Sequence, residues 1–168
     1  MPLAFTKIAS VTVGAGGAAT ISFTSIPQTY TDLCMKLSIR GLGSATNESY
    51  YINVNGTGFT GTRRALFGTG TTAGSENAAN IRWDYFSDAG ATANSFGSGE
   101  LYIPNYTGST NKSISLEGVA EGNVAGMFRA MTAALWSNSA AITSLTLEGL
   151  NGNIAQYSTA VLYGISKS

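Results

Sequence analysis

Acidic residues spaced four apart come nearest to a catalytic pattern in this sequence. Asp84 and Asp88 form one such pair, and Glu117 and Glu121 form another. A glycosidase needs only two carboxyl groups, one acting as acid and the other as base or nucleophile. Aromatic residues flank Asp84 on both sides and would suit a sugar ring. Such pairs arise by chance in most sequences, so we favour an outward-facing Asp84 on a strand whose aromatic neighbours pack.

The other reactive residue types offer little for catalysis or metal binding. The chain contains no histidine, which is the commonest general base and a common metal ligand. The single cysteine, Cys34, lies in an apolar run, where we expect a small buried hydrophobe. Gly14–Gly17 begins like a nucleotide-binding loop, but a strand pattern follows where a helix is needed. We therefore expect no catalytic residues, no cofactor, no metal and no enzyme activity.

Charge and composition narrow the classes of partner. Nine basic and nine acidic residues cancel, and charged residues make up only 11% of the chain. Binding to nucleic acid needs clustered Lys and Arg, and only Arg63 and Arg64 are adjacent, so no nucleic-acid partner is expected. No run approaches the roughly 18 apolar residues of a membrane helix, and no secretory signal is visible. We expect synthesis in a cytoplasm and no membrane contact.

Short segments of alternating apolar and polar residues dominate the chain. The clearest is Leu33–Arg40, in which every second residue is apolar, beginning with the first. Ile8–Val13 and Ala19–Thr24 flank the glycine-rich turn and are predicted to pair as a hairpin. Gly126–Trp136 allows a helix or a strand, and its flanking turns favour a strand with Ser137–Ala140 as its hairpin loop. About eight to ten such strands predict one all-β domain over residues 1–168, a sandwich or barrel.

Two polar segments and a group of aromatic residues are candidates for contact with a partner. Residues 57–80 are predicted to be mostly an exposed loop, in which only Arg64–Phe67 looks like a strand. Residues 87–99 are predicted to be a second loop, and long loops are usually functional. Strand alternation turns one residue of each adjacent aromatic pair outward, and tyrosine is favoured at interfaces. We favour a protein over a glycan as the partner. The candidate interface residues are Tyr50, Tyr51, Arg63, Arg64, Trp83, Tyr85 and Phe86.

Both ends of the chain resemble a recurring pattern in virion proteins of tailed bacteriophages. Two strands lead into Ile26-Pro27 and then into Tyr30-Thr31-Asp32-Leu33 before a long core strand. Ala141–Leu147 and Ser158–Ile165 are similar to the end of the same family. The resemblance covers nearly the whole chain as one module and rests on strands and turns. It implies a jelly-roll-like antiparallel β-sandwich and transfers no functional residue.

Members of that family are capsid decoration (cement) proteins or head modules of tail fibres, and neither use involves catalysis. The first strand begins within a few residues of Met1, without a fibre shaft, which favours a decoration protein. The resemblance then implies a place on the capsid surface of a virion, the major capsid protein as partner, and a homo-oligomer, in particular a trimer. The alternative is a tail-fibre or receptor-binding head that recognises a host glycan or protein. A small glycosidase ranks third.

Overall fold

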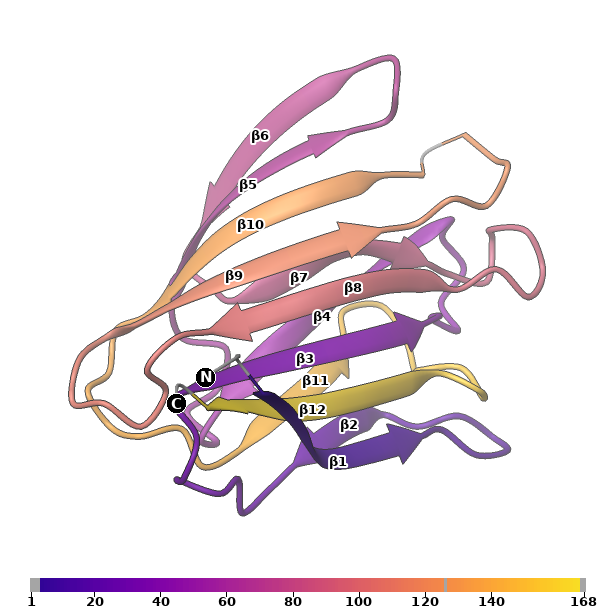
Figure 1. Cartoon of the computed structure of the whole chain (residues 1–168). Helices are drawn as coiled ribbons and strands as arrows, with labels where there is room; N and C mark the ends of the chain where they lie inside the picture. The colour runs from indigo at the N-terminus through magenta and orange to yellow at the C-terminus, as the bar shows by residue number, and fades with distance from the viewer. Residues whose placement is uncertain (1–3, 126, 167–168) are drawn as a thin grey trace.

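Two antiparallel β-sheets pack face to face and account for the alternating sequence (Figure 1). The structure is a computed structural model that describes residues 4–125 and 127–166. Those residues include no helix, and so none that could cross a membrane. The larger sheet has the order β1-β12-β3-β8-β9-β10-β5-β6, and the smaller has the order β2-β11-β4-β7. The strands are β1 (Ala4–Thr12), β2 (Thr20–Phe23), β3 (Asp32–Ile39), β4 (Asn47–Val54), β5 (Thr62–Gly68), β6 (Ala73–Ala78), β7 (Arg82–Ser87), β8 (Gly97–Ile103), β9 (Lys112–Val119), β10 (Arg129–Trp136), β11 (Leu145–Gly149) and β12 (Thr159–Ser166).

Eight of these strands have the connectivity of a jelly roll. β1, β12, β3 and β8 are neighbours in the larger sheet, and β2, β11, β4 and β7 make up the smaller one. Along the chain these eight strands pass from one sheet to the other at every step except β4 to β7, which pair directly. This interleaved order is that of a double-sheet jelly roll. The predicted jelly-roll-like antiparallel β-sandwich is therefore confirmed.

The same crossings correct two predicted hairpins. β1 pairs with β12, and β2 pairs with β11, so the segments around the glycine-rich turn belong to different sheets. β10 is a strand, as favoured, but it pairs with β9 and β5, and the chain after it crosses to β11 in the smaller sheet. Gly126, at the start of the predicted segment, lies outside the described residues. Alternation thus located these strands and did not determine their partners.

Two inserted strand pairs lengthen the larger sheet beyond the jelly roll. β5 and β6 come between β4 and β7 in the chain, and β9 and β10 come between β8 and β11. In space they form one block in the order β9-β10-β5-β6, which we call the extension, and β5 and β6 curve away from the body at its edge (Figure 1). The loop predicted for residues 57–80 is wrong in part: Arg64–Phe67 belongs to β5, as its pattern indicated, but Ala73–Ala78 forms a second strand that pairs with Arg63–Gly68. Gly74 allows this, since a Cβ there would lie 2.6 Å from the Phe67 ring.

The hydrophobic core lies between the two sheets. In β3 the apolar residues predicted to share a face do so and are buried, and β4 supplies Tyr50, Ile52 and Val54 to the same core. Cys34 is buried as well, as expected. Each fully buried Leu, Ile or Met contributes about 1.5–3 kcal/mol relative to exposure, so this core supplies the main stabilisation of the sandwich.

A β-bulge in β7 decides which of its side chains enter the core. Phe86 pairs with Glu48 and Trp83 pairs with Tyr50, so two residues of β7 stand opposite one residue of β4. Tyr85, inside the bulge, has a φ of 65°. The extra residue turns both Trp83 and Phe86 inward although they are three positions apart. Regular alternation would have placed them on opposite faces.

Candidate functional site

Four of the seven predicted interface residues are buried inside the molecule. Tyr50, Trp83 and Phe86 are at most 1% exposed, and their rings meet edge to face with centroids 5.5 Å apart in two pairs. Arg63 is only 2% exposed. The prediction is wrong for these four residues, because a buried side chain offers no surface to a partner. The bulge in β7 and the inward face of β4 are the reasons.

The other predicted aromatic residues are half-buried and already covered by rings of this chain. In each adjacent aromatic pair one residue is less buried, as expected, namely Tyr51 and Tyr85. Tyr51 stacks on Phe59 with centroids 4.4 Å apart, and Tyr85 stacks on Phe128 at 4.2 Å. Neither ring is therefore a free platform for a sugar. Of the seven residues only Arg64 is fully at the surface.

Four charged side chains form a closed ring that joins the extension to the smaller sheet. Arg63 Nη1 of β5 donates to Glu76 Oε1 of β6 and to Asp84 Oδ2 of β7, both at 2.7 Å. Arg82, also on β7, donates from Nη2 to Glu76 Oε1 at 2.8 Å and from Nε to Asp84 Oδ1. Each guanidinium thus bridges both carboxylates. The ring holds the β5–β6 hairpin against β7.

The ionic ring engages both oxygens of the Asp84 carboxylate. That carboxylate is fully buried between two guanidinium groups, so the predicted outward orientation is wrong. Burial raises the pKa of Asp84, and the nearby Arg82 and Arg63 do not offset that rise. Burial also acts to raise the pKa of Glu76, but there the same two guanidinium groups outweigh it and hold the pKa below its ordinary value. Asp88 lies elsewhere, against Gly41 and Gly43. The structure does not bring the glycosidase pair together.

The second acidic pair is exposed and equally unsuited to acid–base catalysis. Glu117 lies 3.4 Å from Arg129, and Glu121 accepts a hydrogen bond from the backbone N–H of Asn123. Both side chains face solvent. In residues 4–125 and 127–166, no group of three or more His, Cys, Asp or Glu residues is placed to hold a metal ion.

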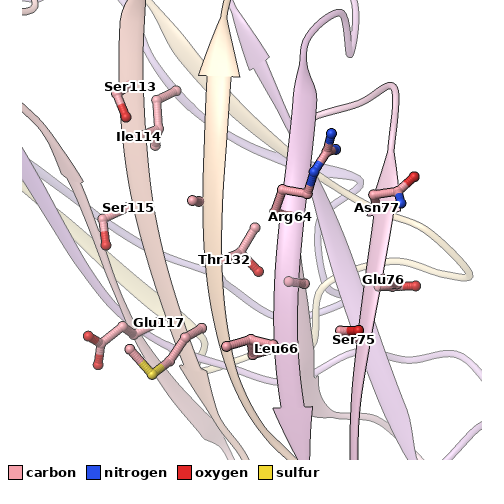
Figure 2. A pocket seen from close by; sticks show the side chains of 13 residues that line it. Arg64, Leu66, Ser75, Glu76, Asn77, Ser113, Ile114, Ser115, Glu117 and Thr132 are labelled. Carbon is pink, nitrogen blue, oxygen red and sulfur yellow. The ribbon is translucent and has the colours of Figure 1, made fainter.

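The outer face of the extension is hollowed and apolar at its centre. Leu66 of β5 and Met131 of β10 stand opposite each other in register and are 65% and 52% exposed. These two residues, which we call the apolar floor, line a hollow of about 550 Å³ that crosses β9, β10, β5 and β6. Figure 2 labels Leu66 among the lining residues. We call this hollow the outer groove. Large apolar side chains this exposed and adjacent mark interaction sites in soluble proteins.

The side chains of the outer groove lie in two rows that cross all four strands, and polar residues flank the apolar ones in each row. Strand register places Ser75, Leu66, Met131 and Glu117 in one row. The neighbouring row contains Asn77, Arg64, Ala133 and Ser115. Figure 2 shows Arg64 and Asn77 toward one end of the groove and Glu117 toward the other. In the part of the chain that the structure describes, no carboxylate forms an ion pair with Arg64, so its charge is available to a partner.

The sequence contains a pattern that could have predicted this surface, although the interface prediction was drawn from the aromatic residues instead. Met131 is two residues from Arg129 on β10, and Leu66 is two residues from Arg64 on β5. Residues two apart on a strand share a face, and Arg is seldom fully buried without a partner. A Leu or Met two residues from an Arg on the same strand therefore indicates an exposed apolar residue. Which of two adjacent arginines is outward depends on the register, and the sequence does not give it.

Within the predicted contact segment 87–99, residues 88–96 form the loop between β7 and β8. Arg40, which follows β3, donates to the backbone carbonyls of Ala89, Ala91, Thr92 and Ser95. A guanidinium with five N–H groups suits this task, because it satisfies several carbonyls at once. Contact of this loop with a shell stays a prediction.

Comparison with known proteins gives no relative of this chain: no family model, no curated protein and no solved structure matches it.

Proposed function

We propose that this chain is a virion structural protein of a tailed bacteriophage, a capsid decoration protein that binds the assembled major-capsid shell through the outer groove. The observation that carries the proposal is the juxtaposed pair Leu66 and Met131, more than half exposed on a hydrogen-bonded sheet. The resemblance of both chain ends to such virion proteins supports the same role.

The chemistry of the outer groove favours a protein partner over a glycan. An apolar centre with a polar border is the usual anatomy of a protein–protein interface. Met131 adapts its shape readily, and Arg64 offers five donors to carboxylate or carbonyl groups. Glycan sites commonly use aromatic rings as platforms, and the described residues that line the groove include none. Because the lining is built from strands, little ordering free energy is lost on binding.

Binding to the assembled shell would stabilise it by mass action. A ligand that binds only the assembled state favours it by RT ln(1 + [L]/Kd), about 2.7 kcal/mol when the free concentration is 100 times Kd. A homotrimer is part of the proposal, because several copies joined together would contact several capsid subunits at once. No catalytic step is needed for this role.

A tail-fibre or receptor-binding head is the second candidate. Tyr157 and Phe5 favour it, since they are 70% and 55% exposed and do not line the outer groove. Exposed tyrosine is well suited to adaptable recognition of a host surface. The two candidates therefore predict different contact residues.

Rebinding to stripped shells tests the proposal. Wild-type protein should co-sediment saturably with shells that lack it and should raise their heat resistance. Met131→Glu places a charge on the apolar floor and should weaken binding about 30-fold or more, the loss of one hot spot of about 2 kcal/mol. Tyr157→Ser is the matched control and should bind normally. Normal binding by Met131→Glu, no shell binding by the wild type, or binding to host cells lost in Tyr157→Ser would refute the proposal.

A further inference from the structure

Two carboxylates lie fully buried at the end of the sandwich where three connecting segments meet. Glu48 and Asp88 are both 0% exposed. The segments that follow β3, β7 and β11 are joined here by backbone hydrogen bonds, among them Gly41 N to Ser87 O and Leu42 N to Asn153 O, both at 2.8 Å. Neither carboxylate lines the outer groove, so a role for them does not depend on the proposed function.

Glycines make room for both carboxylates. A Cβ at Gly41 would lie 2.6 Å from Asp88 Oδ1 and 3.0 Å from Glu48 Cβ. A Cβ at Gly43 would lie 2.6 Å from Asp88 Oδ2, and one at Gly149 would lie 3.6 Å from Glu48 Oε2. The two acidic side chains therefore border the same glycine-rich turn, and any larger residue there would displace them.

The hydrogen bonds of this cluster leave oxygen atoms without partners. Glu48 Oε1 accepts from Ser49 N and from the backbone and side chain of Asn151, and among the described residues Oε2 accepts only from Asn151 N at 3.0 Å. Asp88 Oδ1 accepts from Ala89 N, whereas Oδ2 is buried with no hydrogen-bond partner among the described residues. The Tyr50 hydroxyl is also buried and unpartnered within that part of the chain. Buried polar groups are almost always satisfied by protein, water or an ion, so these oxygens are open to a further partner.

The negative charge of the cluster is also unbalanced. Arg40 is the nearby cation, but its guanidinium N–H groups are directed to the carbonyls of residues 89–95. The Tyr50 phenol interacts electrostatically with both carboxylates and so lies near them. Neither carboxylate forms an ion pair with a described residue, and burying an unpaired carboxylate costs several kcal/mol. A cation would remove that cost.

We propose that Asp88 and Glu48 bind a calcium ion between the segments that follow β3, β7 and β11. The free atoms are all oxygens, which selects a hard cation. Calcium accepts six to eight oxygen ligands in irregular geometry, whereas magnesium demands a near-ideal octahedron, and carboxylates on two loops fit calcium better. The double positive charge matches the two carboxylates. Bound calcium would cross-link the three segments and stiffen this end of the sandwich.

Thermal unfolding of the full chain in metal-free buffer tests the site. Calcium at about 100 times its Kd should raise Tm by roughly 5–10 °C, and the same concentration of magnesium should raise it far less. Asp88→Asn should abolish the calcium-dependent rise. Glu121→Gln, an exposed carboxylate elsewhere, is the matched control and should keep it. A flat response of the wild type, an equal rise with magnesium, or a full rise in Asp88→Asn would overturn the proposal.

A second measurement decides the matter if Asp88→Asn does not fold. Terbium(III) replaces calcium at oxygen sites and emits when a nearby tyrosine is excited, and Tyr50 lies beside these carboxylates. Wild-type protein should sensitise terbium emission, and added calcium should quench it by displacement. Absence of emission that calcium displaces would overturn the proposal.

Discussion

Replacing Arg63 by Leu tests the ionic ring most sharply, because its neighbour Arg64 serves as an internal control. Both residues are on β5 and carry the same charge. Arg63 is 2% exposed and bridges two carboxylates, whereas Arg64 is exposed and forms no ion pair with a described residue. The same substitution at the two positions therefore separates a buried charge from a surface charge.

The expected loss follows from the burial of Asp84. That carboxylate is fully buried, and removing Arg63 leaves it with Arg82 alone. Breaking a buried ion pair by removing one partner costs about 3–5 kcal/mol. The contact with Glu76 adds little, because Glu76 is one-third exposed. For a chain of this size the loss corresponds to a fall in Tm of roughly 6–20 °C, whereas Arg64→Leu should stay within about 0.5 kcal/mol of wild type.

Urea unfolding followed by tryptophan fluorescence gives the free energies directly. Trp83 lies next to Asp84 in β7, so its emission reports the region of the ring. A double variant, Arg63→Leu with Asp84→Leu, should recover much of the loss, because the stranded charge is removed with its partner. Equal small losses for Arg63→Leu and Arg64→Leu would refute the burial and bridging described for this residue.

Three further predictions concern other parts of the molecule. Burial acts to raise the pKa of Glu76, but its two guanidinium partners outweigh burial and hold the pKa below the ordinary 4.5. The charge of Glu76 therefore stabilises the fold above that pH, and this stabilisation is lost as the pH falls below it. The difference in unfolding free energy between wild type and Glu76→Gln should therefore shrink in acid, and a constant difference would contradict this. Burial raises the pKa of Cys34 to about 11, so a thiol reagent at pH 8 should react with it slowly in the native protein. The same reagent should label it fully in guanidinium, and rapid labelling of the native protein would contradict its burial. Gly164→Ala would place a Cβ 2.2 Å from the Tyr30 ring and should lower the free energy of unfolding in urea by about 1–3 kcal/mol. Gly14→Ala, with open space around it, should lower it much less, and equal losses would argue against the packing of Gly164 on Tyr30.

The sequence predicted local structure well because strand alternation is a local property. β3 shows why: its apolar residues recur every second position, and that period alone places them on one buried face. Strand partners depend on crossings between sheets, which leave no local trace. The glycine-rich turn after β1 looked like a hairpin for this reason, although β1 pairs with a strand at the other end of the chain. Arg64–Phe67 of β5 was recognised as a strand, but its partner β6 was missed because small and polar residues form that strand without an apolar pattern.

The site was less predictable than the fold, and the reasons lie in particular residues. Trp83 and Phe86 were expected to alternate, and the bulge around Tyr85 turned both into the core. Asp84 was expected at the surface, but the arrangement of the strands places Arg63 beside it. The groove residues Leu66 and Met131 come from strands that are far apart in the chain, so only the pairing of β5 with β10 reveals that they meet.

A density map of the intact virion would locate the protein and decide whether it decorates the capsid. We expect copies of this two-sheet fold on the outer surface of the shell, with Leu66 and Met131 in contact with the major capsid protein. Density for the chain at the tail alone, or copies on the shell whose outer groove faces solvent, would contradict the proposed role.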